Sequence, residues 1–341
     1  MVIYDRSGNP LQEVFGTVST FGEAINEAGQ SLVSLPRLTQ SISRHLIKPR
    51  NLLSFQDENY GLWAGVIWTP RGWERSRVNL TVYSGEFLFN FRRAPMDEFN
   101  GASGVIASKL LNFANLREPL GVLQGEVFTG GVSHQFTTKY DNMYKALTQF
   151  AERVGEEMIL TPKIDEVSRK LSWTFNWYEK AGQERDFLLE YGNDFTIPDG
   201  EVLVEQGEIA NDILVFGGGA TPSATPISDP TTDEDSMSEY GLIEATFSNN
   251  SVVGATLNLQ AEAMLAEMKE MRKTFNIRVV NSLEKKTFEK TKLGDTIQLS
   301  LEGFGFDSDS SFGTDNLSVR IKARDFDPNS GILTLVVDTV L

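Results

Sequence analysis

Hydrophobic and polar residues alternate along much of this chain, and the clearest succession of patterns lies in residues 238–341. The predicted strands there are 240–247, 275–279, 296–301, 317–325 and 331–340. Between the first two, residues 257–271 change to helical spacing. The apolar stripe of that helix consists of Leu257, Ala261, Met264, Leu265, Met268 and Met271. Pro, Asn and Gly at 327–331 favour a tight turn, so the last two strands are predicted to form a hairpin.

In the first half of the chain, the segment 60–69 is the clearest strand because both of its faces are apolar. Trp63 and Ile67 fall on one face, while Ala64 and Val66 fall on the other. A strand with this pattern is predicted to be covered on both sides.

The middle of the chain mixes helix and strand patterns. A helix is predicted after Gly104, and a stronger one over residues 140–154, with Gly155 placed to end it. Strand 170–177 then puts Trp173, Phe175 and Trp177 on one face. These rings are expected to pack against the 140–154 helix, which needs an apolar partner. The alternative is an exposed platform on which sugar rings stack, as in a carbohydrate-binding or receptor-binding protein.

These patterns predict a β-rich α+β chain in which two β-rich parts frame a small α+β domain. We expect the first β domain in residues 1–100 together with 200–217, and the α+β domain in 101–199. Residues 218–237 are low in apolar residues and rich in Pro, Ser and Asp, and are predicted to be an exposed flexible loop. The second β domain, with one helix, is expected in 238–341.

The charge of the chain is concentrated in one window. The 341 residues include 47 acids and 31 bases, for a net charge of −16. Residues 186–268 contain no Lys or Arg and 16 acids, so the rest of the chain is balanced. The window is either a solubilising surface or a wall that does not hold a passing polyanion. Nucleic-acid binding is disfavoured, because phosphate affinity comes mainly from Lys and Arg.

The residues that commonly carry catalysis or bind metals are scarce. There is no cysteine, and His45 and His134 form no zinc motif. Ser103 and Ser133 lack the G-x-S-x-G turn that presents a nucleophile. Residues 307–315 are acidic but fail the EF-hand pattern, which leaves a solvated loop or, less favoured, an irregular cation site. We predict no catalytic, cofactor-binding or metal-binding residue. No apolar run is long enough for a membrane span.

Several short phrases carry a resemblance to a known family. In order, they are Asn26-Glu27-Ala28-Gly29, Leu35-Pro36, Trp63-Ala64-Gly65-Val66-Ile67, Arg92-Arg93-Ala94, Glu190-Tyr191-Gly192-Asn193-Asp194 and Gly294-Asp295. Together with the long closing hairpin, this order resembles phage tail hub or tail-tip proteins of the siphophage baseplate-hub type. That family is similar in fold to the contractile-phage baseplate hub.

The resemblance implies that the two β domains are barrel-like and that three chains form a ring with pseudo-sixfold symmetry. Such a ring would dock the tail tube to the tip of a virion assembled in the host cytoplasm. Implied partners are the tail tube, distal tail and tape measure proteins and central fibre or tip proteins. Longer family members carry a C-terminal enzyme or fibre. This chain finishes with its closing strand at Leu341, so we expect no such activity.

Under this interpretation the acidic window borders a channel through which DNA passes without binding. The candidate channel-lining residues are Glu201, Glu205, Glu208 and Asp212. The expectation is a structural, non-enzymatic protein. The alternative is a carbohydrate-binding tail-tip protein that uses Trp173, Phe175 and Trp177.

Overall fold

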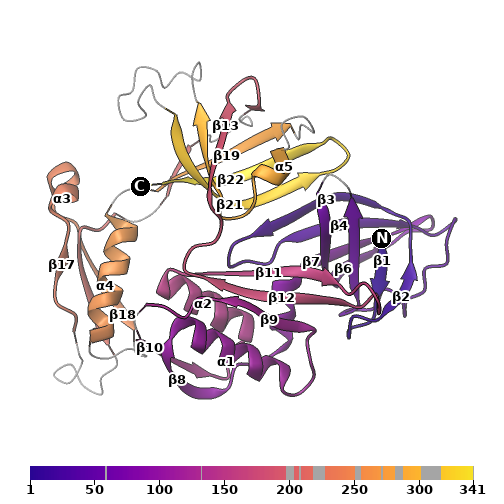
Figure 1. Ribbon diagram of the computed structural model, residues 1–341, viewed down its shortest axis with the longest axis horizontal. Helices are drawn as coiled ribbons and strands as arrows, with labels where there is room; N and C mark the ends of the chain where they lie inside the picture. The colour runs from indigo at the N-terminus through magenta and orange to yellow at the C-terminus, as the bar shows by residue number, and fades with distance from the viewer. Residues whose placement is uncertain are drawn as a thin grey trace.

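The computed structural model describes residues 1–57, 60–131, 133–196, 203–206, 209–217, 227–249, 255–269, 272–280, 287–300 and 316–340. The fold is a β-rich α+β fold, as the sequence predicts. Figure 1 shows an N-terminal β unit, a middle unit with two long helices, a C-terminal β unit and a small unit around α3 and α4. Among the described residues, no helix is long and apolar enough to cross a membrane.

The N-terminal unit is an antiparallel sheet that follows the order β3-β4-β7-β6-β5-β1-β2. Its strands are β1 (Val2–Tyr4), β2 (Pro10–Glu13), β3 (Thr17–Ala24), β4 (Gln30–Pro36), β5 (Leu52–Asp57), β6 (Gly61–Trp73) and β7 (Arg77–Ser84). A 3-10 helix, η1 (Gly85–Phe91), then leads into the middle unit.

The C-terminal unit is built on the predicted closing hairpin, which the structure confirms. Its elements are β13 (Glu184–Glu190), β14 (Phe195–Thr196), β15 (Leu203–Gln206), β19 (Arg272–Val280), α5 (Thr287–Lys290), β20 (Thr296–Ser300), β21 (Leu317–Asp327) and β22 (Ile332–Thr339). Strand β21 pairs with β22 on one side. On the other side it pairs with both β20 and β3.

The pairing of β21 with β3 makes the two β units one continuous sheet. Phe326 of β21 lies opposite Phe21 of β3 in the ladder, and their rings meet edge to face at 5.6 Å. Phe55, Trp63 and Phe288 belong to the same buried cluster. The two β units therefore share one hydrophobic core and do not have separate cores.

Strand β6 confirms the prediction of burial on both faces. Trp63 and Ile67 are in the core shared by the two β units. Ala64 and Val66 are in the core of the middle unit. Because side chains alternate across a strand, β6 can contribute to both cores.

The middle unit consists of two helices and two small sheets. Its elements are β8 (Met96–Ala102), α1 (Ser103–Asn115), β9 (Val122–Val127), β10 (Ser133–Lys139), α2 (Met143–Val154), β11 (Glu157–Ile164) and β12 (Leu171–Tyr178). Helix α2 begins after Asn142, whose side chain accepts a hydrogen bond from the Lys145 amide. It ends at Gly155, which has φ +68°. The predicted end of this helix is confirmed.

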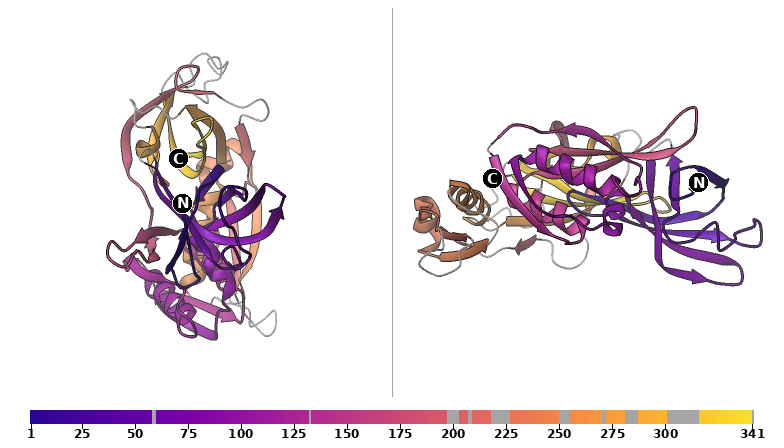
Figure 2. Two further views of the ribbon diagram at one scale, coloured as in Figure 1. Left: turned by 90° about the vertical axis from the view of Figure 1, so that its right-hand side faces the viewer. Right: turned by 90° about the horizontal axis from the view of Figure 1, so that it is seen from below.

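A fourth, small unit was not predicted. It contains β16 (Asp212–Gly217), β17 (Thr231–Thr232), α3 (Glu234–Tyr240), β18 (Glu244–Asn249) and α4 (Ala255–Met268). Its own core includes Ile213 and Val215 of β16 and Leu257, Ala261 and Leu265 of α4. Figure 2 shows this unit at one end of an elongated molecule and the N-terminal unit at the other.

Several predicted boundaries are corrected by the strand pairing. The described strands of segment 200–217 do not join the first β unit, because β15 pairs with β19 and β16 pairs with β17 and β18. Strands β13 and β14 belong to the C-terminal sheet and not to the middle domain. In the predicted loop 218–237, residues 231–232 form β17 and α3 begins at Glu234; residues 218–226 lie outside the described residues.

Candidate functional site

The aromatic face of β12 is buried, so the sugar-stacking interpretation is wrong. Trp173 is 1% exposed, and Phe175 and Trp177 are fully buried. Trp177 stacks on Phe150 of α2, with ring centroids 5.7 Å apart. The preferred prediction, in which this face packs on the 140–154 helix, is confirmed. A sugar ring has no access to side chains held this way.

The four candidate channel residues fall in different places. Glu201 and Glu208 lie outside the described residues. Glu205 lies in β15, opposite Lys273 in the ladder with β19. Asp212 begins β16, opposite Thr232 of β17 and Glu244 of β18. The two described positions are therefore on different sheets, and their place on a channel stays a prediction.

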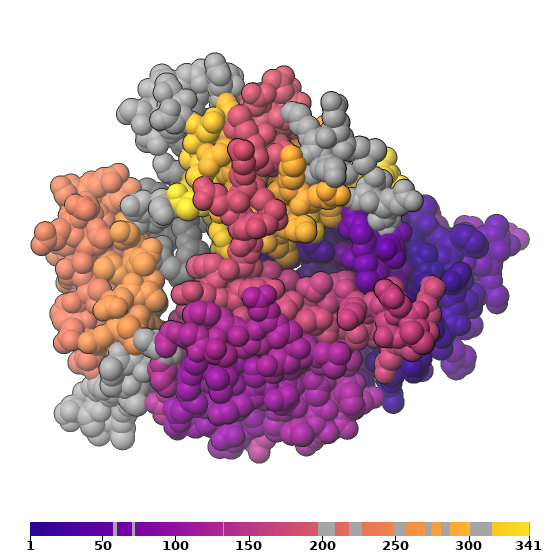
Figure 3. All heavy atoms as spheres, in the orientation of Figure 1, coloured from indigo at the N-terminus to yellow at the C-terminus, as the bar shows by residue number. Residues whose placement is uncertain are grey.

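Much of the acidic window is folded into the small unit. Helix α3 begins at the cap Asp233, whose carboxylate accepts a hydrogen bond from the Ser236 amide. The exposed acids of α3 are Glu234, Asp235 and Glu239. Acids in the first turn complement the helix dipole. Figure 3 shows the small unit (orange) at the edge of the molecule, beside the middle unit (purple).

A buried ion pair fastens the middle unit to the closing hairpin. The Glu157 carboxylate of β11 receives hydrogen bonds from both terminal nitrogens of Arg320 in β21, at 2.6 and 2.5 Å. The Ala181 amide donates a third bond at 2.8 Å, and Lys322 Nζ lies 3.8 Å away. Burial acts to raise the pKa of Glu157. The bonds from Arg320 and Ala181 outweigh it and hold the pKa below its usual value.

The predicted Gly294-Asp295 turn contacts the segment that connects β12 of the middle unit to β13. Gly294 has φ +81° and lies directly against Gly182, where a Cβ would be 2.1 Å from the Gly294 carbonyl carbon. Asp295 accepts hydrogen bonds from the Gln183 amide at 3.0 Å and from Arg185 Nε at 2.8 Å. The sequence phrase therefore marks a close backbone approach that only glycine allows.

A cleft of about 680 Å³ lies where the N-terminal, middle and C-terminal units meet. Glu86 of η1 lines it, with its carboxylate bonded to the Ser84 hydroxyl and the Leu160 amide. Burial raises the pKa of Glu86 to about 7. This carboxyl links η1 to β11, so its protonation state bears on how the two units are held together.

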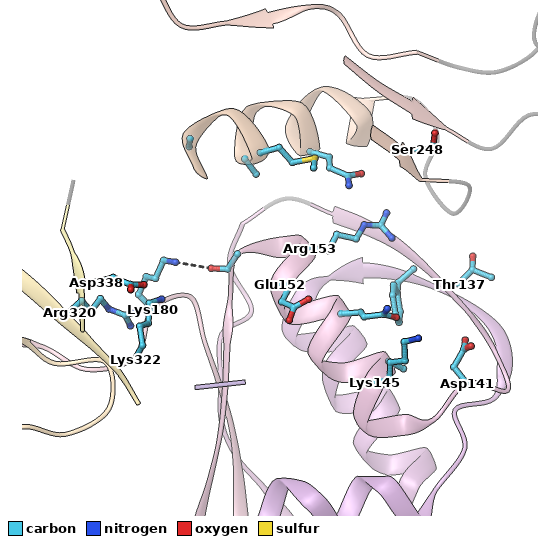
Figure 4. Close-up of a pocket in the computed structure, with 18 of the residues that line it drawn as sticks. Thr137, Asp141, Lys145, Glu152, Arg153, Lys180, Ser248, Arg320, Lys322 and Asp338 are labelled. Carbon is cyan, nitrogen blue, oxygen red and sulfur yellow. Dashed lines mark hydrogen bonds between the residues drawn. The ribbon is translucent and has the colours of Figure 1, made fainter. Parts of the chain in front are cut away.

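A second cleft is basic, although the protein is acidic. It measures about 1040 Å³ and lies between α2, β10, the closing hairpin and α4 (Figure 4). Its charged side chains are Lys139, Lys145, Arg153, Lys180, Arg320 and Lys322, with Asp141, Glu152 and Asp338. In Figure 4, Lys145 and Arg153 come from α2, while Arg320 and Lys322 come from the hairpin. Burial lowers the pKa of Arg153 to about 10.

The sequence does not predict this cleft. Its cations come from residues 139–153, from residue 180 and from residues 320–322, three stretches that are far apart in the sequence. A single basic residue on a helix or strand is ordinary surface composition. No signal in the sequence could have joined them, because only the packing of the units brings them to one place.

Among the described residues, those considered for catalysis have structural contacts. The Ser103 hydroxyl donates to the Glu156 carboxylate at 2.6 Å. The His134 ring lies edge-on to Phe150, 6.3 Å between centroids. The part of the chain that the structure describes contains no group of three or more His, Asp or Glu side chains that could hold a metal ion. Residues 307–315 lie outside that part.

Comparison with known proteins identifies the fold. No protein-family model and no curated protein sequence matches the chain. Among solved structures, it is similar to prophage tail protein gp18 of Listeria monocytogenes, with TM-score 0.61 and 10% identity, covering 100% of this chain and 94% of that one. It is also similar to the 43 kDa tail protein of prophage MuSo2 from Shewanella oneidensis, with TM-score 0.61 and 13% identity over 99% and 97%.

Two further structures extend the similarity. A tail protein of Neisseria meningitidis matches with TM-score 0.57 and 11% identity, over 99% of this chain and 95% of that one. An Escherichia coli component of the type VI secretion system matches with TM-score 0.53 and 12% identity, over 97% and 75%; it is described as similar to T4 tail proteins gp27 and gp5. The chain thus has the fold that these phage tail proteins share.

Proposed function

We propose that this chain is a structural protein of a phage-type tail and acts as the hub at the distal end of the tail tube. The observation that carries this proposal is the agreement in fold with two prophage tail proteins over nearly the whole length of each chain. Agreement over the whole chain includes the fused β units and the middle unit between them. A shared single domain would support much less.

In the proposed assembly, three copies form a ring that docks the tube to the tip. Each chain has two β-rich units, joined through β3 and β21 into one sheet. Three copies would therefore present six β units, which suits a sixfold tube. The proposed partners are the tail tube, distal tail and tape measure proteins and the central fibre or tip proteins.

The test of this assembly is the mass of the purified protein by light scattering, with negative-stain imaging. A trimeric ring with a central hole is expected. A monomer that forms no ring when mixed with the tail tube protein of the same virion would contradict the proposal. Mixing is included because some tail proteins assemble only on their neighbours.

We further propose that the acidic window borders the channel of this ring, so that DNA passes without binding. Support comes from the absence of Lys and Arg in residues 186–268. Changing Glu201, Glu205, Glu208 and Asp212 to Lys should slow DNA ejection from assembled particles while the trimer remains intact. Unchanged ejection would place these residues away from the channel and leave the hub proposal standing.

A further inference from the structure

Four cations of the large cleft have no ion-pair partner among the described residues. Arg320 and Lys322 are engaged by Glu157. The remaining four are Lys139, Lys145, Arg153 and Lys180. The contacts recorded for the Arg153 and Lys180 side chains are to backbone carbonyls, those of Gln135 at 3.3 Å and Gly155 at 3.1 Å. Such cations can receive carboxylates from outside the chain.

The described residues of the small unit place no acid in the lining of this cleft. It contributes Ser248 of β18 and four residues of α4, namely Gln260, Ala263, Met264 and Ala266. All five are uncharged. The exposed acids Glu234, Asp235 and Glu239 are on α3, which does not line the cleft.

The cleft also runs along an open strand edge. Within the described residues, β10 pairs with β8 and with no other strand. Phe136 and Thr137 are consecutive in β10, and both line the cleft. Consecutive side chains point to opposite faces of a strand, so both can border one space only if it follows the strand edge. Arg153 lines the cleft and donates a hydrogen bond to the Gln135 carbonyl of β10. A backbone acceptor of β10 therefore points toward the cleft.

The remaining lining residues favour a polypeptide over a nucleic acid. The cleft offers small or adaptable apolar contacts from Ala146, Ala263, Met264, Ala266 and Val340. Among the described residues that line this cleft, Phe136 is the one aromatic, and it is 8% exposed. These residues therefore provide no row of rings on which bases could stack.

We propose that this cleft binds an extended, acidic polypeptide segment of a partner protein, which adds as a strand to the edge of β10. Backbone hydrogen bonds to β10 provide the alignment. Lys139, Lys145 and Arg153 receive its carboxylates, and the apolar wall of α4 contacts the side chains on its other face. The inference rests on this chain's own geometry and does not require the hub proposal.

The test measures fluorescence anisotropy of a labelled peptide with the full chain. The probe is a peptide of about ten residues in which Glu and Val alternate, a length of about 33 Å when extended. Three comparison probes are a Gln/Val peptide, the Glu/Val peptide with alternate backbone nitrogens methylated, and an oligothymidylate of equal charge. The Glu/Val peptide is expected to bind saturably and more tightly than each of the other three.

The matched variants exchange exposed lysines only. Changing Lys139→Glu and Lys145→Glu should weaken binding roughly tenfold or more, because two attractive charges become repulsive. The control changes Lys109→Glu and Lys163→Glu, which are exposed but outside the cleft, and should bind as the wild type does. Circular dichroism verifies that both variants fold. The proposal would be overturned by any of four results. They are equal affinity for the methylated peptide, tighter binding of oligothymidylate, identical behaviour of the two variants, and no saturable binding.

Discussion

Arg320 and Glu157 stand 163 positions apart in the chain and form a two-point ion pair at 2.6 and 2.5 Å. The Glu157 side chain is 3% exposed and that of Arg320 is 14% exposed. The pair joins β11 of the middle unit to β21 of the closing hairpin, which also joins the two β units. Loss of this ion pair should therefore destabilise the contacts among all three units.

Replacing Glu157→Gln should lower the free energy of unfolding by about 3–5 kcal/mol, since it leaves a buried guanidinium without its counter-charge. Chemical denaturation gives the value. Glu74→Gln is the matched control, because Glu74 pairs with Arg77 on the surface, where both side chains are about half exposed (44% and 55%). No measurable change is expected there. Similar losses of unfolding free energy in both variants would show that the buried pair with Arg320 stabilises the fold no more than a surface pair does.

The pH dependence of the same contact has a definite sign. The pKa of Glu157 is lowered in the folded protein, because the bonds from Arg320 and Ala181 outweigh the effect of burial. Its contribution to stability is present above the unfolded pKa and is lost as the pH falls through the folded pKa. Acid unfolding of the wild type should therefore be steeper in pH than that of Glu157→Gln, as followed by circular dichroism. Parallel curves would contradict this expectation.

Glu86 should act in the opposite direction. Burial raises its pKa from the usual 4.5 to about 7, so the folded protein holds a proton that the unfolded chain releases. Stability should fall as the pH rises from about 4.5 to about 7, then level off. In Glu86→Gln, a mimic of the protonated form that can keep the bonds to Ser84 and Leu160, this loss should be absent. Denaturant midpoints across this pH range measure it, and an unchanged slope in Glu86→Gln would refute it.

The contact between Gly182 and Gly294 can be separated from backbone strain. Gly182→Ala places a Cβ 2.1 Å from the Gly294 carbonyl carbon at a residue with φ +81°. Gly331→Ala is the control, with φ +70° and no atom within 4 Å of the added Cβ. The control should lose about 1–2 kcal/mol from strain alone. Gly182→Ala should lose clearly more in the same denaturation experiment, and equal losses would mean that the clash relaxes at no cost.

The buried aromatic face provides a last prediction. Trp177→Ala should cost about 3–5 kcal/mol in unfolding free energy, because it removes the ring stacked on Phe150 and leaves a cavity. Isothermal titration with wall polysaccharide should show no binding to the wild-type face. Saturable binding that disappears in a Trp177→Phe variant of native stability would restore the carbohydrate interpretation.

The sequence by itself determined the local elements of this protein. Local sequence patterns predict the helical period of α2 and its end at Gly155. They also predict the two apolar faces of β6 and the closing hairpin, and the structure contains all of these. Burial on both faces of β6 and the packing of Trp177 could also be predicted, because an apolar face must be covered. The fold class follows from these same patterns.

Only the tertiary structure decided which strands share a sheet and which charges share a cleft. A backbone edge pairs with whichever strand packing brings beside it, so β15 joins β19 and β16 forms a sheet of its own with β17 and β18. The cations of the cleft are likewise unremarkable one by one. They share a cleft because the middle unit, the closing hairpin and α4 surround one space. Long-range packing energy leaves no local signature in a sequence.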